Sequence, residues 1–266
     1  MLEKIGKAKG QTEAEVIASI LSARDASDRK AACDTLGKLG EAAAPHLSAV
    51  AERLADDDSG VRYVECQALG KHGEARGQTV VGLVMPALTS SVKGARACAC
   101  QILGQLGEAA APHLCAIAAE PHLGAVAERL ADGNWQVRVA ACETLGKHGQ
   151  ARGQTVAAQE LLVDTESDVR GEACRALGKH GEAAAPHLGA IAARLADEDK
   201  TVRAAACKAL GTLGEAAVPH LGSVAGRLSD DNRDVRKAAC IALGNHGEAH
   251  APGRRAAPRC SRRVSL

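Results

Sequence analysis

One phrase recurs seven times along this chain of 266 residues: an arginine four residues before a cysteine, and the pair Leu-Gly starting three residues after it. The Leu-Gly pairs begin at Leu36, Leu69, Leu103, Leu145, Leu177, Leu210 and Leu243. Five of the six intervals fall within about two residues of one another, whereas the interval after Leu103 is longer. Self-similarity at this period is typical of a repeat protein, in which each unit packs only against its neighbours.

Each unit contains two amphipathic patterns. In PHLGAIAARLAD, apolar residues with helical spacing predict a first helix that opens at Pro186, where a missing N–H does no harm. In VRAAACKALG, a second stripe predicts a second helix, and Gly211 and Gly214 are expected to end it in the left-handed conformation. The short polar turn DEDK makes the two helices antiparallel. We therefore predict an all-α fold, an α-α superhelix or solenoid of about seven antiparallel helical hairpins.

Composition and charge favour the same class. The chain has one Trp, one Tyr and no Phe, so burial must come from many thin helix contacts rather than from an aromatic core. Residues 1–250 carry 28 basic against 32 acidic residues, which disfavours nucleic-acid binding by this part. No apolar run approaches the roughly 20 residues that span a bilayer. These features predict a cytoplasmic, monomeric protein that is not membrane-bound.

The repeated unit resembles the HEAT-repeat family over roughly residues 11–250, especially the short HEAT-like repeats of the phycobilisome-lyase type. The resemblance implies a right-handed superhelix whose second helices line the concave side. It also implies a ladder between the acids of the Leu-Ala-Asp phrase and the arginines of the second helices. Matched to this sequence, the ladder joins Asp56, Asp132, Asp197 and Asp230 with Arg62, Arg138, Arg203 and Arg236.

The array, expected over residues 1–250, is predicted to be irregular around residues 76–130. First helices have two spellings: GQT opens them at Thr12, Thr79 and Thr155, and PH opens them elsewhere. Thr12 and Glu15 fit a capping box at the start of the array. PHLCAIAAE (112–120) is followed by the near-copy PHLGAVAER, which turns the apolar face by about half a turn and places Pro121 where a single helix would be interrupted. Pro86 also falls inside a first helix.

Cysteine and histidine are the residues that could carry chemistry. Seven cysteines recur at one second-helix position: Cys33, Cys66, Cys100, Cys142, Cys174, Cys207 and Cys240. Stacked hairpins lie about 10 Å apart, too far for a disulfide, so we expect reduced, buried thiols. A chromophore- or redox-active cysteine stays as the alternative. Histidines recur in the last turn of second helices (His72, His148, His180 and His246), where the helix dipole favours them at solvated positions.

No pattern predicts a catalytic residue, a metal ligand or a cofactor. The deoxyhypusine hydroxylases are HEAT-like enzymes that bind iron through His-Glu pairs, and this chain has no His-Glu dipeptide. The glycines serve helix ends rather than a phosphate loop. We expect the protein not to be an enzyme. A HEAT-like enzyme or a protein related to the chromophore lyases remains the alternative.

The outward positions of the second helices vary from unit to unit, whereas the inward letters repeat. A concave surface that binds a protein partner would show this contrast, and so would neutral drift at solvated positions. The candidate binding residues are Tyr63, Gln67, Val139, Glu143, Arg175, Lys208, Lys237 and Ile241. We therefore predict a protein-protein interaction scaffold, with Tyr63, Val139 and Ile241 as apolar anchors. The identity of the partner is not encoded in any recognisable motif.

Residues 251–266, APGRRAAPRCSRRVSL, carry five arginines and no acid, and form a predicted disordered tail. This tail is the one segment expected to contact nucleic acid or an acidic partner. Arg262-Arg263-Val264-Ser265 also fits a basophilic kinase site, and a solvated end without function is the alternative to all three.

Overall fold

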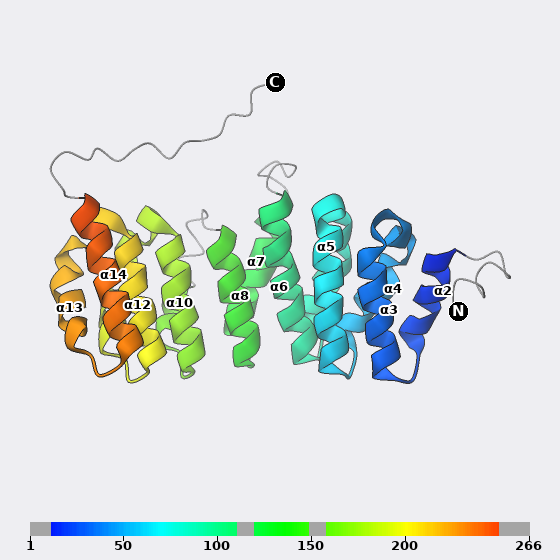
Figure 1. Ribbon diagram of the computed structural model, residues 1–266, viewed down its shortest axis with the longest axis horizontal. Helices are drawn as coiled ribbons and strands as arrows, with labels where there is room; N and C mark the ends of the chain where they lie inside the picture. The colour runs from blue at the N-terminus through cyan, green and yellow to red at the C-terminus, as the bar shows by residue number, and fades with distance from the viewer. Residues whose placement is uncertain (1–11, 111–119, 149–157, 250–266) are drawn as a thin grey trace, which may run out of the picture. The chain divides into compact units, whose positions relative to one another are not determined.

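The computed structural model describes residues 12–110, 120–148 and 158–249, which form α-helices, 3-10 helices and the turns between them (Figure 1). The chain divides into two compact units, residues 1–157 and 158–266. The tail predicted over residues 251–266 and the helix start at Thr155 lie outside the described residues. No helix in the described ranges is long and apolar enough to cross a membrane.

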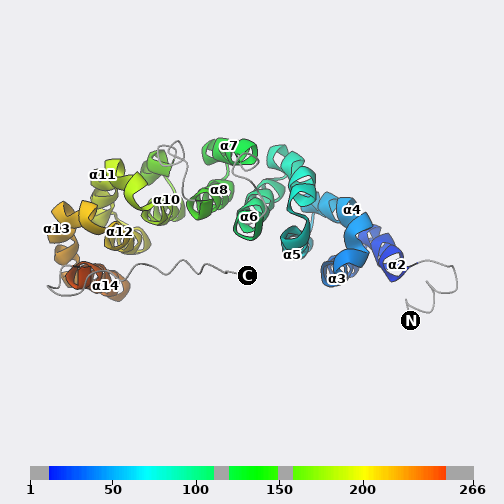
Figure 2. The ribbon, with the colours of Figure 1, turned by 90° about the horizontal axis from the view of Figure 1, so that it is seen from above.

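The first unit is a stack of helices in two layers. The second helices of its hairpins pack on one another in chain order, α3 on α5, α5 on α6 and α6 on α8, and form one layer (Figure 2). Helices α4 and α7 lie in the other layer. The α-helices are α2 (Glu13–Ser19), α3 (Ala26–Lys38), α4 (Leu47–Ala51), α5 (Ser59–Val84), α6 (Lys93–Ala110), α7 (Glu120–Glu128) and α8 (Trp135–His148).

The second unit repeats this design. Its second helices pack as α10 on α12 and α12 on α14, while α11 and α13 cover one side of them (Figure 2). The α-helices are α10 (Ser167–Lys179), α11 (Leu188–Ala193), α12 (Lys200–Thr212), α13 (Leu221–Gly226) and α14 (Arg233–Ala249). Consecutive antiparallel hairpins of this kind confirm the predicted all-α repeat fold.

The first helices are shorter than predicted, because 3-10 segments replace their ends. The helix expected to open at Pro186 has its α-helical part only from Leu188, and Pro186 lies in the preceding 3-10 segment. Proline disfavours the α conformation in the residue before it, which explains the tighter turn. The 3-10 segments are Ile20–Ser22, Gly40–His46, Glu52–Ala55, Met85–Thr89, Arg129–Ala131, Leu161–Val163, Gly181–His187, Arg194–Ala196, Gly214–His220 and Arg227–Ser229.

The predicted helix starts have mixed outcomes. Thr12 and Glu15 form the expected capping box, with Thr12 N to Glu15 Oε2 at 2.7 Å and Glu15 N to Thr12 Oγ1 at 3.3 Å. The start at Thr79 is wrong, because α5 runs unbroken from Ser59 to Val84. The GQT spelling contains no proline, so nothing forces the helix to end before Thr79.

Proline punctuates the irregular part of the first unit. Pro86 lies at the start of the 3-10 segment Met85–Thr89 rather than inside an α-helix. Pro121 lies in the first turn of α7. Residues 111–119, which hold most of the first near-copy, lie outside the described residues.

The leucines of the repeated phrase form the core. Leu36, Leu69, Leu103, Leu145, Leu177 and Leu210 are each at most 1 % exposed, whereas Leu243 is only half-buried. The cysteines of the phrase follow the same trend: six are buried, and Cys240, expected to be buried, is exposed. Among the described elements, α14 packs on α12 and α13 but has no helix on its other side, which explains both exceptions.

The two glycines at the end of a second helix have different roles. Gly214 has a φ of +60° and ends the helix in the left-handed conformation, as predicted. Gly211 was predicted to do the same, and this is wrong, because it lies inside α12. A Cβ at Gly211 would lie 2.6 Å from Ala242 Cα of α14, so this glycine lets the two second helices approach closely.

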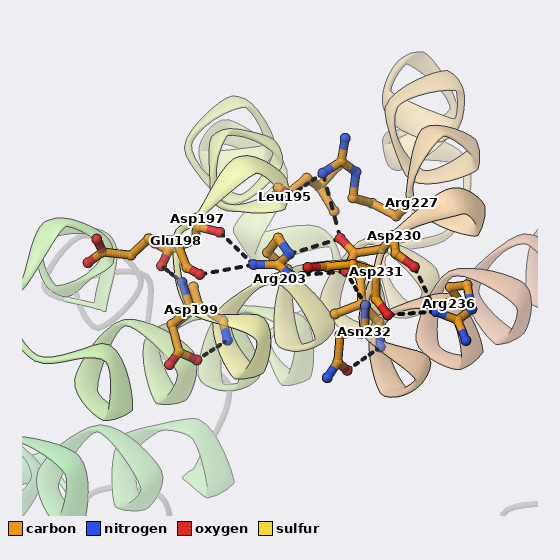
Figure 3. Close-up of polar contacts among 12 residues, drawn as sticks. Leu195, Asp197, Glu198, Asp199, Arg203, Arg227, Asp230, Asp231, Asn232 and Arg236 are labelled. Atoms are coloured by element: carbon orange, nitrogen blue, oxygen red, sulfur yellow. Dashed lines mark hydrogen bonds and ion pairs between the residues drawn. The ribbon is translucent and has the colours of Figure 1, made fainter.

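Arginine side chains link neighbouring hairpins. Arg203 of α12 donates through Nη1 to two carbonyls of its own turn, Asp197 O and Glu198 O, both at 3.0 Å. Its Nε and Nη2 donate to the two carboxylate oxygens of Asp230 in the following hairpin, both at 2.9 Å (Figure 3). The same bidentate pairing joins Arg29 to Asp56, Arg96 to Asp132 and Arg170 to Asp197.

The ladder therefore exists, but its rungs differ from those that the resemblance implied. Each aspartate carboxylate pairs with the arginine of the preceding hairpin, and the arginine of its own hairpin binds the aspartate's backbone carbonyl instead, as Arg236 binds Asp230 O at 2.7 Å. That arginine sits on the first turn of the helix, directly above its own turn, so the carbonyl is the nearer acceptor. In the third hairpin Ser90 stands at the aspartate position, so this rung lacks a carboxylate.

Acid should weaken the ladder. The hydrogen bond from Arg29 lowers the pKa of Asp56, and that from Arg96 lowers the pKa of Asp132. A carboxylate whose pKa is lower in the folded chain stabilises it above the ordinary pKa near 4 and loses this contribution as the pH falls further.

Histidines at the ends of second helices are buried rather than solvated, which corrects the sequence prediction. His72 Nε2 lies 3.0 Å from Leu36 O, and His246 Nε2 lies 3.1 Å from Leu210 O, in each case on the preceding second helix. A carbonyl only accepts, so Nε2 must be the protonated nitrogen. His180 is buried too, and the side chain of His148 lies outside the described residues. His72 and His246 thus satisfy C-terminal carbonyls of the neighbouring helix.

Candidate binding surface

The outward positions of the second helices are mostly accessible. Tyr63 is 65 % exposed and Ile241 is 49 % exposed, the two largest apolar side chains on these positions. Val139 and Glu143 of α8 are half-buried. The remaining candidates are all exposed: Gln67, Arg175, Lys208 and Lys237.

Helix register explains why these side chains point outward. In α12, Val202, Ala206 and Leu210 are fully buried in the hairpin, whereas Lys208 points away from them and is exposed. Equivalent positions on neighbouring second helices lie side by side, so Arg175, Lys208 and Ile241 form a row across α10, α12 and α14. The row exists because one helical phase repeats in each unit.

The second unit has a groove along this row. Its floor consists of small residues, Ala204, Ala205 and Ala238, which are nearly buried. The absence of longer side chains at these positions leaves a hollow of about 440 Å³. The residues around the floor are Arg175, Lys200, Thr201, Lys208, Asn232, Asp234, Lys237 and Ile241. Four of the predicted binding residues are therefore brought together here.

The groove carries an excess of positive charge. Arg175, Lys200, Lys208 and Lys237 line it, against one acid, Asp234. Arg175 Nε binds Glu172 Oε2 at 2.7 Å, so part of its charge is compensated. Lys200, Lys208 and Lys237 have no ion-pair partner in the described part of the chain. Unpaired ammonium groups around an apolar floor attract anionic groups with apolar neighbours.

Lys200, Thr201, Asn232 and Asp234 also line the groove, and sequence reasoning did not include them. They lie at or near the beginning of α12 and α14. Lys200 lies one helical turn before Ala204, an outward position of α12. Carrying the outward positions back into the first turn of the helix would have identified Lys200. Asn232 Oδ1 accepts from the backbone N–H of Asp234 at 2.9 Å, which fixes this end of α14.

In the first unit the predicted residues lie on two helices. Tyr63 and Gln67 are one turn apart on α5, and Val139 and Glu143 are one turn apart on α8. Glu143 Oε1 pairs with Lys147 Nζ at 3.2 Å. Helix α6 lies between α5 and α8 in this layer, so the two pairs are not in direct contact.

The repeated thiols are poorly suited to nucleophilic chemistry. The described cysteines are free thiols. Burial raises the pKa of Cys33, Cys100 and Cys174 to about 12, so these groups stay protonated at neutral pH. In the described ranges, no three His, Cys, Asp or Glu side chains are grouped to hold a metal ion.

Comparison with known proteins supports the repeat assignment. The family model described as HEAT repeats matches residues 123–194 and 189–253. A search of curated proteins finds no match. A crystal structure of an engineered protein is similar with a TM-score of 0.59 and 20% identity, over 92% of this chain and 71% of that one.

A second engineered protein is similar with a TM-score of 0.44 and 18% identity, over 90% of this chain and 98% of that one. The likeness to the first engineered structure concerns the fold alone. The family match lies on α7 to α14, where the hairpins, the buried leucines and the ladder repeat. Residues 123–253 therefore match the HEAT-repeat family, and the described residues form an all-α repeat solenoid.

Proposed function

We propose that this protein is a scaffold without enzymatic activity that binds a protein partner on the face lined by the second helices of its hairpins. HEAT repeats generally mediate protein interactions. The observation that carries the proposal is the contrast on each second helix. The residues at inward positions repeat from unit to unit and are buried. The residues at outward positions vary, and they include exposed apolar side chains such as Tyr63 and Ile241.

Tyr63 and Ile241 are suited to be anchors. Large apolar side chains at the centre of an interface supply much of its binding free energy. Both side chains are held on long helices, α5 and α14, which limits the conformational entropy that is lost on binding. The varied polar residues around them would give specificity.

The repeat subtype and the compartment are parts of the same proposal. The Leu-Gly phrase and the short polar turns support a relation to the short repeats of the phycobilisome-lyase type. This relation concerns the repeat rather than the activity of those proteins. We propose that the chain works in the cytoplasm, where buried unpaired thiols such as Cys174 stay reduced.

The proposal is tested by capturing partners with purified protein and measuring their affinity for two multiple variants. The triple variant Tyr63→Glu, Val139→Glu and Ile241→Glu should bind the captured partner with at least tenfold lower affinity. The matched control, Ser48→Glu with Ser223→Glu, adds charge to exposed positions of α4 and α13 and should leave the affinity within twofold. The reverse pattern, with the control variant losing the partner, would place the interface on the first helices.

A further inference from the structure

We propose that the groove across α10, α12 and α14 binds an extended acidic segment of the partner protein, with an apolar side chain of that segment against Ile241. The inference rests on the proposed function and adds the chemistry of the ligand. It is carried by the three unpaired lysines, the alanine floor and the exposed isoleucine that meet in one hollow.

Charge selects an acidic ligand. Lys208 and Lys237 stand on neighbouring helices, α12 and α14, and both line the groove with no carboxylate partner in the described part of the chain. Arg175 adds a further positive charge at the α10 end, although Glu172 offsets part of it. A carboxylate between two ammonium groups would gain from its attraction to both.

The nearby acids Asp199 and Asp231 bind groups other than the groove lysines. Asp199 caps α12, with its Oδ1 accepting from the Thr201 backbone N–H at 2.6 Å. Asp231 Oδ1 accepts from Arg203 Nη2 at 3.1 Å. Asp234 is the single acid on the lining, and it lies at the end of the groove near the turn. The acidic part of the ligand should therefore lie nearer to Lys208 than to Asp234.

Shape selects an extended backbone. Adjacent packed helices are about 8–10 Å apart, so a row across three helices spans about 20 Å. An extended chain rises about 3.3 Å per residue, so about six residues would cross the row. The floor residues Ala204, Ala205 and Ala238 are small, so they leave room for an extended backbone. The ligand is thus a short linear segment.

Ile241 sets the orientation of the ligand. It occupies on α14 the position that Lys208 occupies on α12 and Arg175 occupies on α10, so the row changes from basic to apolar at this end. Ile241 is half exposed in a groove that is otherwise polar on its walls. An acidic segment that ends in an apolar residue would match this change.

The test measures fluorescence anisotropy of two labelled peptides, EEEEEL and QQQQQL, titrated with the full chain at physiological salt. The acidic peptide should bind at least tenfold more tightly than the neutral one. Lys208→Glu and Lys237→Glu should each lower the affinity for the acidic peptide at least fivefold. Ile241→Ser should lower it about threefold. Circular dichroism and thermal melting should show that the variants stay folded.

Lys71→Glu is the matched control, because Lys71 is an exposed lysine one turn beyond Gln67 on α5. It should leave the affinity for EEEEEL within twofold. An equal loss from Lys71→Glu would show that the peptide senses overall charge rather than the groove, and would overturn the inference. A labelled oligothymidylate that binds more tightly than EEEEEL, with the same response to Lys208→Glu, would also overturn it and indicate a nucleic-acid site.

The acidic-segment inference and the proposed scaffold function can fail independently. If EEEEEL fails to bind but a captured partner is still lost in the variant carrying Tyr63→Glu, Val139→Glu and Ile241→Glu, the acidic-segment inference is wrong and the scaffold proposal stands. If the acidic peptide binds as expected and the triple variant keeps the partner, the groove is a ligand site and the scaffold proposal is wrong.

Discussion

Glu65 occupies the position directly before the repeated cysteine, where the other copies of the phrase carry alanine: Ala32, Ala99, Ala141, Ala173, Ala206 and Ala239. Its side chain is fully buried, and neither carboxyl oxygen has a hydrogen-bond partner among the described residues. Burial raises the pKa of Glu65 to about 10, so this carboxyl is held in its neutral form. The residue therefore costs folding free energy that its alanine counterparts do not.

Glu65→Ala should stabilise the protein by about 1–3 kcal/mol, the range for relieving a buried unsatisfied polar group. Chemical denaturation followed by circular dichroism measures the change. Leu210→Ala, which removes a well-packed apolar side chain, should instead destabilise the protein by about 2–5 kcal/mol. Destabilisation by Glu65→Ala would mean that the carboxyl has a favourable partner.

The pH dependence gives a second check on Glu65. A carboxyl whose pKa is raised in the folded chain destabilises that chain increasingly as the pH rises from its ordinary value near 4.5 towards about 10. The stability advantage of Glu65→Gln over the original protein should therefore grow between pH 5 and pH 9. A constant difference over this range would contradict the burial of an unpaired carboxyl.

Arg170 tests the contribution of a single residue to the arginine–aspartate ladder. Its guanidinium pairs with Asp197, and the side chains are only 7 % and 3 % exposed. Arg170→Met would leave the buried Asp197 carboxylate with Arg194 Nη1, at 3.4 Å, as its remaining ion-pair partner, and should cost about 3–5 kcal/mol. The control is Lys38→Met, because the Lys38–Asp34 pair is 65 % and 47 % exposed and should contribute at most about 0.5 kcal/mol. Equal effects in thermal melting would contradict a structural role for the ladder.

At the scale of elements, the second helices are held by contacts that single residues make with the neighbouring hairpin. Gly211 meets Ala242, His246 meets the carbonyl of Leu210, and Thr212 Oγ1 donates to Gly178 O at 3.1 Å. These contacts join the end of one second helix to the next. They explain why the Leu-Gly pair repeats more faithfully than the polar residues around it.

Gly211→Ala should destabilise the protein by about 1–3 kcal/mol, because the new Cβ would clash with the α14 backbone. Gly222→Ala is the matched control, since Gly222 lies in α13 and no atom of the described residues comes within 4 Å of a Cβ built there. Alanine should stabilise that helix by up to about 1 kcal/mol. Opposite signs in denaturant titrations are expected. A stabilising Gly211→Ala would refute the close-approach role.

Local patterns predicted the elements well where the cause is local. The period of the phrase identified the hairpins, the apolar stripe identified the buried leucines, and the Thr12–Glu15 spacing identified the capping box. Each of these is fixed within one helix or one turn. The start at Thr79 failed because a helix ends only where something breaks it, and α5 meets no such break before Val84.

The missed features depend on contacts between hairpins. Spacing along the chain does not show that Asp230 faces the arginine of the preceding hairpin, or that His72 reaches Leu36 O. The same holds for the candidate surface. The sequence identified the outward phase of Arg175, Lys208 and Ile241, whereas the groove that joins them to Lys200 depends on the packing of three helices.

At the scale of the whole molecule, the chain consists of two compact units, residues 1–157 and 158–266, built from the same hairpin. The first unit carries Tyr63 on its second helices, and the second unit carries the basic groove. Repeats that share a core can therefore differ on their outward face. Such differences let one array offer distinct surfaces to a partner.

The most direct test of the central claim is site-specific photo-crosslinking of a captured partner. Benzoylphenylalanine would be placed at Tyr63 and Ile241 on the second helices, and at Ser48 and Ser223 on the first helices, in separate variants. The account predicts covalent adducts with the partner from Tyr63 or Ile241 and none from the two serine positions. Adducts from Ser48 or Ser223, with none from the second helices, would contradict it.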